Sequence, residues 1–437
     1  MASPIGGCRR WEIRFEKDGR VLTDDGLAAE IGPGPVTDLV VFSHGWNTSE
    51  SSARDLGNGL FEMVVAELAP SRRLSTGLVT VLWPSLLFPE DEPAADGPVV
   101  TNPGDAQGAE GPPPVRLPPG EPSTGAELAV ALSPAFPSRH SELARIGQLL
   151  DTRPQDAGRL AELHRLATGL VTTPNDAPED AGEVAACSEP TAVVLDALSG
   201  LAPRAGDAQG LGVFDTLWDG ARELVRVLSY YEMKNRAGTI GRRGLGPLLA
   251  RLQGLRPDLR VHLVGHSFGA RLVAFSLLGL PAGPATPVRS LLLVQGAFSH
   301  FSFADPMPID GARRGALAGV ADRVDGPLLA TFTAADRAVG WWYPNASRLS
   351  RDDDQAAAVP GYRWGGMGFD AFQQARTVDQ RLEPPGTPYG WKAGTFYRLD
   401  ATHVVNRQLS WFAGAHSDIR KPEIAWAAVT AAGLADG

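Results

Sequence analysis

The sequence predicts an α/β fold, in which a mostly parallel sheet is flanked by helices. Three observations support this class. Short apolar runs alternate with segments of helical periodicity, one such run leads through a tight Gly-rich turn into a helix, and a Gly- and Pro-rich block interrupts the alternation. The predicted architecture is therefore one α/β domain that carries a large insertion.

Six apolar runs predict the parallel strands, because strands buried on both faces read as short continuous apolar segments. A further run at 11–15 (WEIRF), followed by the turn Lys17-Asp18-Gly19, predicts an antiparallel edge strand. Helical spacing of apolar residues occupies much of the chain between the strands. The six strands are 38–42, 78–82, 261–264, 290–294, 328–332 and 395–399, and the clearest helices are 214–233, 245–255, 270–278 and 422–432.

The block 86–210 departs from this alternation. Residues 86–125 are dominated by Pro, Gly and acidic residues, so they have too few groups to bury to offset their ordering entropy. A second loop, 172–190, has a similar composition. Between the two loops, two sets of leucines and isoleucine keep helical spacing, namely Leu143, Ile146, Leu149, Leu150 and Leu160, Leu163, Leu166, Leu170. We therefore expect residues 1–85 and 211–437 to form the α/β domain and 86–210 to form a partly helical, partly irregular cap.

Composition excludes several classes of function. Forty basic against fifty acidic residues give a net charge of -10, which disfavours binding to nucleic acid. No run approaches the roughly 18 apolar residues of a membrane span, and the first residues lack the apolar core of a secretion signal. The two cysteines, Cys8 and Cys187, provide neither a disulfide framework nor a thiolate metal site. We expect a cytoplasmic protein without a metal or cofactor.

The segment Gly265-His266-Ser267-Phe268-Gly269 follows the run 261–264 directly and leads into the helix 270–278. G-x-S-x-G alone is a weak signal in a chain with 50 glycines, so its context decides its meaning. A strand-to-helix turn lifts a serine clear of the sheet, and the helix start supplies N–H groups that suit an anionic intermediate. Ser267 is therefore the candidate nucleophile.

Three further segments extend the pattern: Ser43-His44-Gly45-Trp46-Asn47, Trp83-Pro84-Ser85, and SYYEMKNRAG at 229–238. With GHSFG, they resemble the α/β-hydrolase superfamily, and more narrowly a group of poorly characterised bacterial serine hydrolases. The resemblance covers about 35–85 and 214–432 and leaves the insertion out. It implies an oxyanion hole formed by the backbone N–H groups of Phe268 and Trp46.

The resemblance also implies the chain order Ser, acid, His. Asp336 lies just after the run 328–332, which is the penultimate predicted strand. His416 lies in the loop before the helix 422–432, where the family places its catalytic histidine. We therefore predict Ser267, Asp336 and His416 as the catalytic triad. His300 precedes any plausible acid, so the weaker alternative for the base is His403. The weaker alternatives for the acid are Asp305 and Asp310, whereas Asp400 is expected to serve the strand or a turn.

The other histidines have simpler explanations. His44 is expected to support the oxyanion loop, His266 to pack beside the nucleophile, and His262 to lie in the core. His140 and His164 are expected on the surface of the cap. Two aromatic groups follow predicted strand ends, where they either line an apolar substrate pocket or pack in the core. They are Phe298, Phe301 and Phe303, and Trp341, Trp342 and Tyr343.

These residues predict a serine hydrolase that cleaves a small-molecule carboxylic ester through an acyl-enzyme. Ester is preferred over thioester or amide only because this fold is used mostly for esters. One alternative is a catalytically silent scaffold whose acidic, Pro-rich segment recruits a partner. Another is a non-hydrolytic relative, such as a lyase or perhydrolase. The sequence identifies no protein partner.

Overall fold

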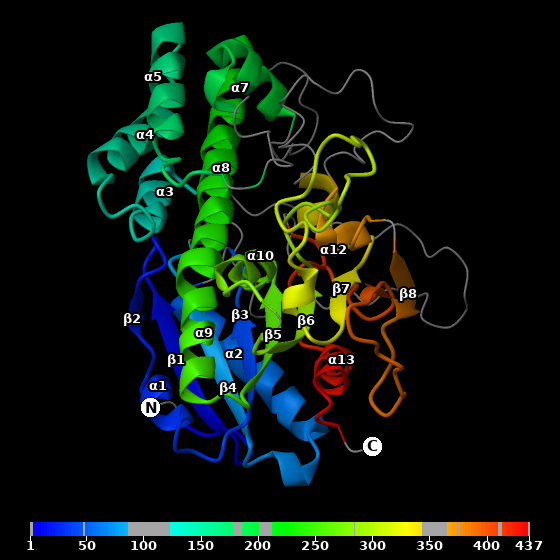
Figure 1. Cartoon of the computed structure of the whole chain (residues 1–437). Coiled ribbons are helices and arrows are strands. Elements are labelled where there is room, and N and C mark those ends of the chain that lie inside the picture. The colour runs from blue at the N-terminus through cyan, green and yellow to red at the C-terminus, as the bar shows by residue number, and fades with distance from the viewer. Residues whose placement is uncertain are drawn as a thin grey trace.

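The computed structural model describes residues 3–46, 49–85, 123–175, 177, 186–200, 212–283, 285–342, 365–374, 376–409 and 413–435. These residues form one nine-stranded sheet in the order β2-β1-β4-β3-β5-β6-β7-β9-β8 (Figure 1). All neighbouring strands are parallel except β1 and β2, so the predicted α/β class with a mostly parallel sheet is confirmed. The strands are β1 (Arg9–Phe15), β2 (Val21–Thr23), β3 (Asp38–Ser43), β4 (Thr76–Leu82), β5 (Arg260–His266), β6 (Val288–Val294), β7 (Leu328–Phe332), β8 (Thr377–Arg381) and β9 (Phe396–Asp400).

Two features of the sheet differ from the sequence prediction. The run 11–15 lies in β1, which pairs parallel with β4 and is not an edge strand. The antiparallel edge is the three-residue β2, which β1 reaches through the predicted turn. At the other edge, β8 carries the sequence TVDQR, and polar, largely exposed residues of this kind give no apolar run to detect.

The sheet separates two apolar cores because successive side chains of a strand point to opposite faces. In β3, Leu39 and Val41 pack into one core with apolar residues of α8, α9 and α10, whereas Val40 and Phe42 pack into the other with α2 and α13. This explains why all six residues of β3 are buried. The helices are α1 (Leu27–Ile31), α2 (Glu50–Glu67), α8 (Val213–Ile240), α9 (Gly246–Leu255), α10 (Phe268–Ser276), α12 (Met367–Asp370) and α13 (Pro422–Ala432), with a π-helical turn at Gly241–Leu245 between α8 and α9.

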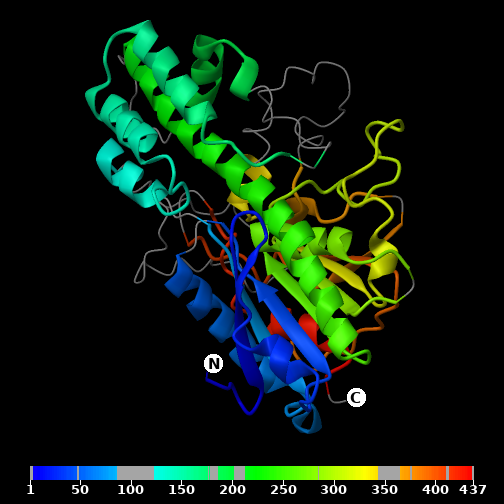
Figure 2. The same ribbon diagram turned by 60° about the vertical axis from the view of Figure 1, so that its left-hand side comes forward.

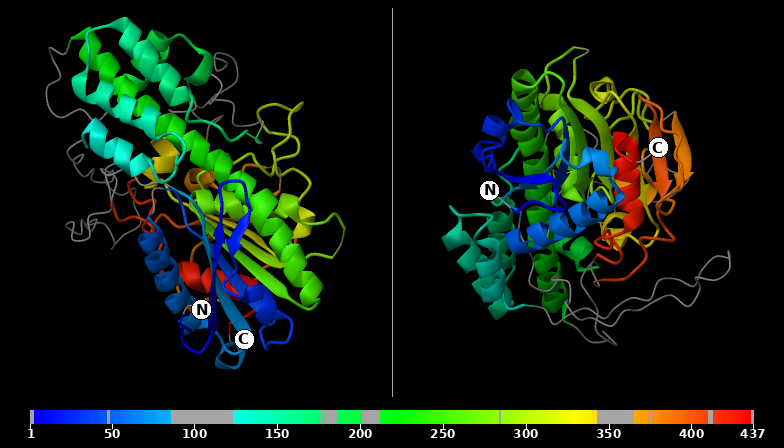
Figure 3. Two further views of the ribbon diagram at one scale, coloured as in Figure 1. Left: turned by 90° about the vertical axis from the view of Figure 1, so that its left-hand side faces the viewer. Right: turned by 90° about the horizontal axis from the view of Figure 1, so that it is seen from below.

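Four helices of the insertion gather around one end of α8, which runs on from them along the sheet (Figures 1 and 2). Figure 3 shows this group of helices beyond one end of the sheet. The two predicted leucine patterns of the insertion form helices, as expected. The four helices are α3 (Gly125–Leu132), α4 (His140–Thr152), α5 (Ala157–Thr168) and α7 (Thr191–Ser199). The predicted irregular stretch lies outside the described residues at 86–122, and so do residues 176 and 178–185 of the second loop.

One prediction for the cap is wrong. His164 is buried, with one ring nitrogen bonded to the Thr191 hydroxyl at 2.9 Å and the other to the Ala186 carbonyl at 2.9 Å. The sequence of α5 shows that His164 lies on one face of a helix, but it does not show which neighbouring segment covers that face. His140, by contrast, is exposed as expected.

A buried ion pair on α8 fastens the insertion to the sheet. Glu232 accepts hydrogen bonds from the backbone N–H groups of Thr172 (2.7 Å) and Thr173 (2.8 Å), and from Arg236 at 3.1 Å. Burial opposes ionisation of Glu232, but the Arg236 charge and these N–H groups outweigh it and hold the pKa of the carboxyl below its usual value. Arg236 also donates to the carbonyls of Pro84, after β4, and Ala135, after α3.

None of the described helices combines the length and apolar character needed to cross a bilayer.

Candidate active site

The predicted triad residues all lie where strands end. Ser267 follows β5, Asp336 lies in the loop after β7, and His416 lies in the loop between β9 and α13. Because β5, β6, β7 and β9 are successive parallel neighbours, their carboxyl ends share one edge of the sheet. Open α/β sheets bind their ligands at this edge.

Ser267 occupies a strained turn between β5 and α10. Its backbone angles are φ 58° and ψ -122°, which a non-glycine residue rarely adopts. Its N–H donates to the Val294 carbonyl at 3.1 Å, which holds the turn against the end of β6. Two residues later, Gly269 packs so closely on the carbonyls of Ser43 and His44 that a Cβ would clash with them. The start of α10 is thereby pressed against the end of β3.

Asp336 and His416 form a buried pair. The Nδ1 of His416 lies 2.7 Å from Oδ2 of Asp336, which is fully buried. The Val339 N–H donates to the other carboxylate oxygen at 2.9 Å. A proton on Nδ1 leaves Nε2 of His416 as the acceptor. Among the described residues, no hydrogen bond links the Ser267 hydroxyl to His416.

Gln295 is a residue of this site that the sequence did not reveal. It follows β6 with φ 46°, is fully buried, and donates from Nε2 to Asp336 at 3.1 Å and to the Gly368 carbonyl at 2.9 Å. Its Oε1 accepts from the Thr331 hydroxyl at 2.8 Å, which fixes the amide orientation. Gln295 therefore restrains the same carboxylate oxygen that His416 contacts. No local sequence motif marks this role of Gln295. Its positive φ and its hydrogen-bond partners, which lie elsewhere in the chain, are evident only in the folded structure.

His266 connects the turn at Ser267 to the His416 loop. Its Nε2 lies 2.9 Å from the His416 carbonyl, and the centroids of the two rings are 4.9 Å apart. Burial, with a smaller contribution from nearby His416, lowers the pKa of His266 to about 3. The neutral ring can donate only from Nε2 in this arrangement, so it supports the His416 backbone as well as packing beside Ser267.

The loop after β3 packs against Ser267. A Cβ at Gly45 would lie 2.6 Å from Cβ and 3.1 Å from Oγ of Ser267, so only glycine permits this approach. His44 bonds through Nδ1 to the Gly45 carbonyl at 2.9 Å, and its own carbonyl accepts from the Trp83 indole at 3.1 Å. Burial lowers the pKa of His44 to about 4, which keeps it neutral near pH 7. His44 therefore supports the loop, as expected from the sequence.

The two residues expected to supply oxyanion N–H groups adjoin this contact. Phe268 is the first residue of α10, where backbone N–H groups have no partner within the helix. The Trp46 ring packs 6.0 Å from that of Phe268, and both rings pack on Tyr230 of α8. The Tyr230 ring thus holds the two segments together.

The alternative acids and bases lie in other settings. His403 is exposed and accepts a hydrogen bond from Arg381 at 3.2 Å. Asp400 accepts from the Thr402 N–H in a local turn, and Asp305 pairs with Arg314 at the surface. Asp310 similarly caps a local turn through the Ala312 N–H. His262 is a buried, hydrogen-bonded core residue, as expected, with Asp38 at 3.2 Å and Ser290 at 3.1 Å.

His300 belongs to a pair that the sequence did not suggest. Its Nδ1 lies 2.7 Å from Asp370, which stands 70 residues later on α12. The Gln373 N–H also donates to the His300 carbonyl. These bonds hold α12 beneath the Gln295 amide, because Gly368 of α12 is the residue whose carbonyl that amide contacts. His300 thus supports α12, and α12 in turn holds the Gln295 amide that contacts Asp336.

The aromatic candidates for a substrate pocket have different positions. Phe298 and Phe301 are fully buried, and Phe303 packs against Phe372 and Phe396, so these three contribute to side-chain packing. Trp341 and Trp342 lie in a π-helical turn (Ala338–Trp342), and the directions of their side chains are not described. Tyr343 lies outside the described residues.

Over the described residues, no group of three or more His, Cys, Asp or Glu side chains is placed to hold a metal ion. No protein-family model matches the chain, and searches of curated proteins and of solved structures found no match.

Proposed function

We propose that the chain is a serine hydrolase with an α/β-hydrolase fold, and that it cleaves a carboxylic ester of a small molecule. The observation that carries the proposal is the strained serine at the β5–α10 turn on the same sheet edge as the buried Asp336–His416 pair. A serine hydroxyl needs a base to accept its proton, and that base needs a third group to orient it. The three side chains are the types that this chemistry requires.

In the proposed reaction, Nε2 of His416 accepts the proton of Ser267 while Oγ attacks the ester carbonyl carbon. Asp336 keeps the other ring nitrogen protonated and stabilises the imidazolium that forms. His416 then gives its proton to the departing alcohol, and a water molecule hydrolyses the acyl-enzyme by the same route in reverse. The hydrogen bond between Ser267 and His416 would form with substrate in place, since such contacts are often long without it.

The developing oxyanion is expected to accept hydrogen bonds from the N–H groups of Phe268 and Trp46. The start of α10 adds the positive end of a helix dipole at this position. Gly45 is essential to this arrangement because it allows the loop after β3 to reach Ser267. Gln295 and His266 are proposed as positioning residues, the first for Asp336 and the second for the loop of His416.

A fluorophosphonate probe tests the nucleophile. We expect one labelled site per chain, lost in Ser267→Ala and retained in Ser290→Ala, a control at a buried serine of β6. Turnover of p-nitrophenyl acetate and butyrate above the Ser267→Ala background then separates an ester hydrolase from a scaffold. Labelling that persists in Ser267→Ala, or is absent from the native chain, refutes the assignment.

A further inference from the structure

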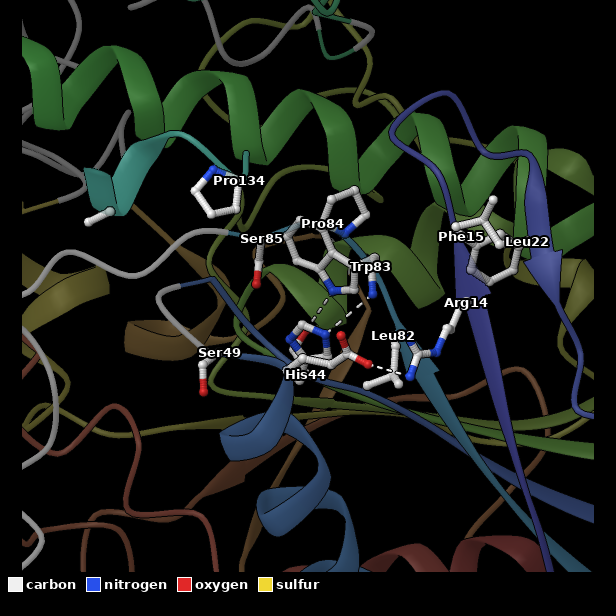
Figure 4. A pocket seen from close by; sticks show the side chains of 12 residues that line it. Arg14, Phe15, Leu22, His44, Ser49, Leu82, Trp83, Pro84, Ser85 and Pro134 are labelled. Carbon is white, nitrogen blue, oxygen red and sulfur yellow. Dashed lines mark hydrogen bonds and ion pairs between the residues drawn. The ribbon is translucent and has the colours of Figure 1, made fainter. Parts of the chain in front are cut away.

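A cavity of about 420 Å³ lies above the carboxyl ends of β1, β4 and β3 (Figure 4). Its walls on the sheet side include Leu82 and Trp83, at the end of β4, and His44, which follows β3. Small-molecule sites in proteins span roughly 300–1,000 Å³, so the cavity suits a small organic group.

The insertion contributes to the opposite wall. Ala131 of α3 and Pro134, just after that helix, line the cavity. Arg236 fixes this wall to the sheet, since its guanidinium donates to the Pro84 carbonyl and to the Ala135 carbonyl, at 3.0 Å each. A buried side chain therefore ties together the segments after β4 and after α3, both of which contribute to the cavity wall.

The lining is mostly apolar, but it also contains His44, Ser49, Ser85 and one charge pair. Phe15 of β1 and Leu22 of β2 extend the apolar wall formed by β4. Arg14 and Glu50, both partly exposed, pair with each other at 2.5 Å, and the same Glu50 oxygen also pairs with Arg54, so both charges of the lining are paired. Nothing in this balance selects a charged ligand; the lining favours an uncharged, apolar group.

The cavity adjoins the candidate nucleophile through one short loop. His44 lines the cavity, and the next residue, Gly45, is in contact with Ser267. In the sheet, β3 lies between β4 and β5, so the cavity and the serine occupy adjacent positions along one edge. The cavity and Ser267 are therefore neighbours, separated by the loop that begins at His44.

We infer that this cavity binds one apolar arm of the ester, either its acyl chain or its alcohol, and limits the length of that arm. The inference rests on the proposed function. It gives the insertion a role in specificity, because Ala131 and Pro134 close the space in which the arm lies.

Ala131→Trp tests the inference, because the indole fills the cavity from its cap side. Ala126→Trp is the matched control, since Ala126 is exposed on the same helix and does not line the cavity. Leu22→Trp, on the opposite wall at a residue 52% exposed, is a second filling variant should the first fail to fold. Circular dichroism and fluorophosphonate labelling stoichiometry establish folding and site integrity before kinetics.

Two ester series are compared in all variants: p-nitrophenyl esters from acetate to decanoate, and acetate esters of alcohols of increasing length. In one of the two series, we expect the filling variants to have a lower kcat/KM than the native chain for the longer esters. The loss should be about tenfold for every two methylenes that the indole displaces. Acetate in the acyl series and the shortest alcohol should stay within about twofold. Equal length dependence in filled, control and native chains, with Ser267 still labelled, overturns the cavity assignment while leaving the hydrolase proposal intact. Absence of Ser267 labelling in the native chain overturns both.

Discussion

Adding one methyl group at Gly45 is expected to disable Ser267 without unfolding the protein. The added Cβ would lie 2.6 Å from the Ser267 Cβ, whereas ordinary contact begins near 3.4 Å, so the two segments must separate by about 0.8 Å. The φ of Gly45 lies outside the left-handed region, so the effect is steric and not a backbone conflict. A displacement near 1 Å costs about 100-fold in rate, equivalent to about 2.7 kcal/mol of activation free energy.

The assay is the rate of fluorophosphonate labelling, with kcat/KM for p-nitrophenyl acetate as a second measurement and thermal melting as the check on folding. Gly254→Ala is the control, because a Cβ there meets no atom within 4 Å. It should leave both rates unchanged and stabilise α9 by about 0.5–1 kcal/mol. A folded Gly45→Ala variant that is labelled at the native rate would falsify the proposal that the close approach of the loop after β3 positions Ser267 for attack.

Three further predictions concern positioning, the buried ion pair and acid stability. Gln295→Leu removes a donor from the Asp336 carboxylate, so under the proposed mechanism kcat per labelled site should fall about tenfold with KM unchanged. A loss confined to the number of labelled sites would instead mean a purely structural role. Arg236→Met leaves Glu232 buried without its cation and should lower the free energy of unfolding by about 3–5 kcal/mol in urea. Adding Glu232→Gln should recover part of this loss, and no recovery contradicts the pairing. His44 and His266 have pKa values of about 4 and about 3, below the ordinary 6.5. As pH falls, these two histidines are protonated in the unfolded chain before they are protonated in the folded one. The stabilisation that they give above pH 6.5 is therefore lost as pH falls toward 4, and the free energy of unfolding drops by about 1.4 kcal/mol per pH unit for each histidine. Thermal melting should show this slope, and His44→Asn should reduce it; an unchanged slope contradicts the assignment to His44.

The features that the sequence predicted are those with local signals. Five of the six apolar runs lie wholly within parallel strands, and the last begins one residue before β9, since residues buried on both faces of a sheet form continuous apolar segments. The strand-to-helix turn at Ser267 was predictable because Gly265 and Gly269 lie two residues before and two residues after it. Asp336 and His416 were selected because the family resemblance implies their order and their places after strands. Their hydrogen bond at 2.7 Å could only be observed in the fold.

The missed features depend on contacts between distant segments. Gln295 meets its carboxylate 41 residues later, and His300 meets Asp370 70 residues later, with no motif at either spacing. The burial of His164 depends on the covering segment around Ala186. β8 was not predicted because an exposed edge strand needs no apolar pattern. In each case the determining interaction is tertiary, so propensity and periodicity contain no signal for it.

The position of the insertion constrains how the candidate site can work. The chain leaves the sheet after β4 and returns through α8, and the segment around α3 faces the ends of β1 and β4 across the cavity. Arg236 binds both the segment after β4 and the segment after α3, and its partner Glu232 is fully buried. Opening the cap at this point would separate a buried ion pair from its partners, which is strongly unfavourable. Substrate selection is therefore expected to depend on the shape of the existing cavity at this junction and not on wide opening of the cap there.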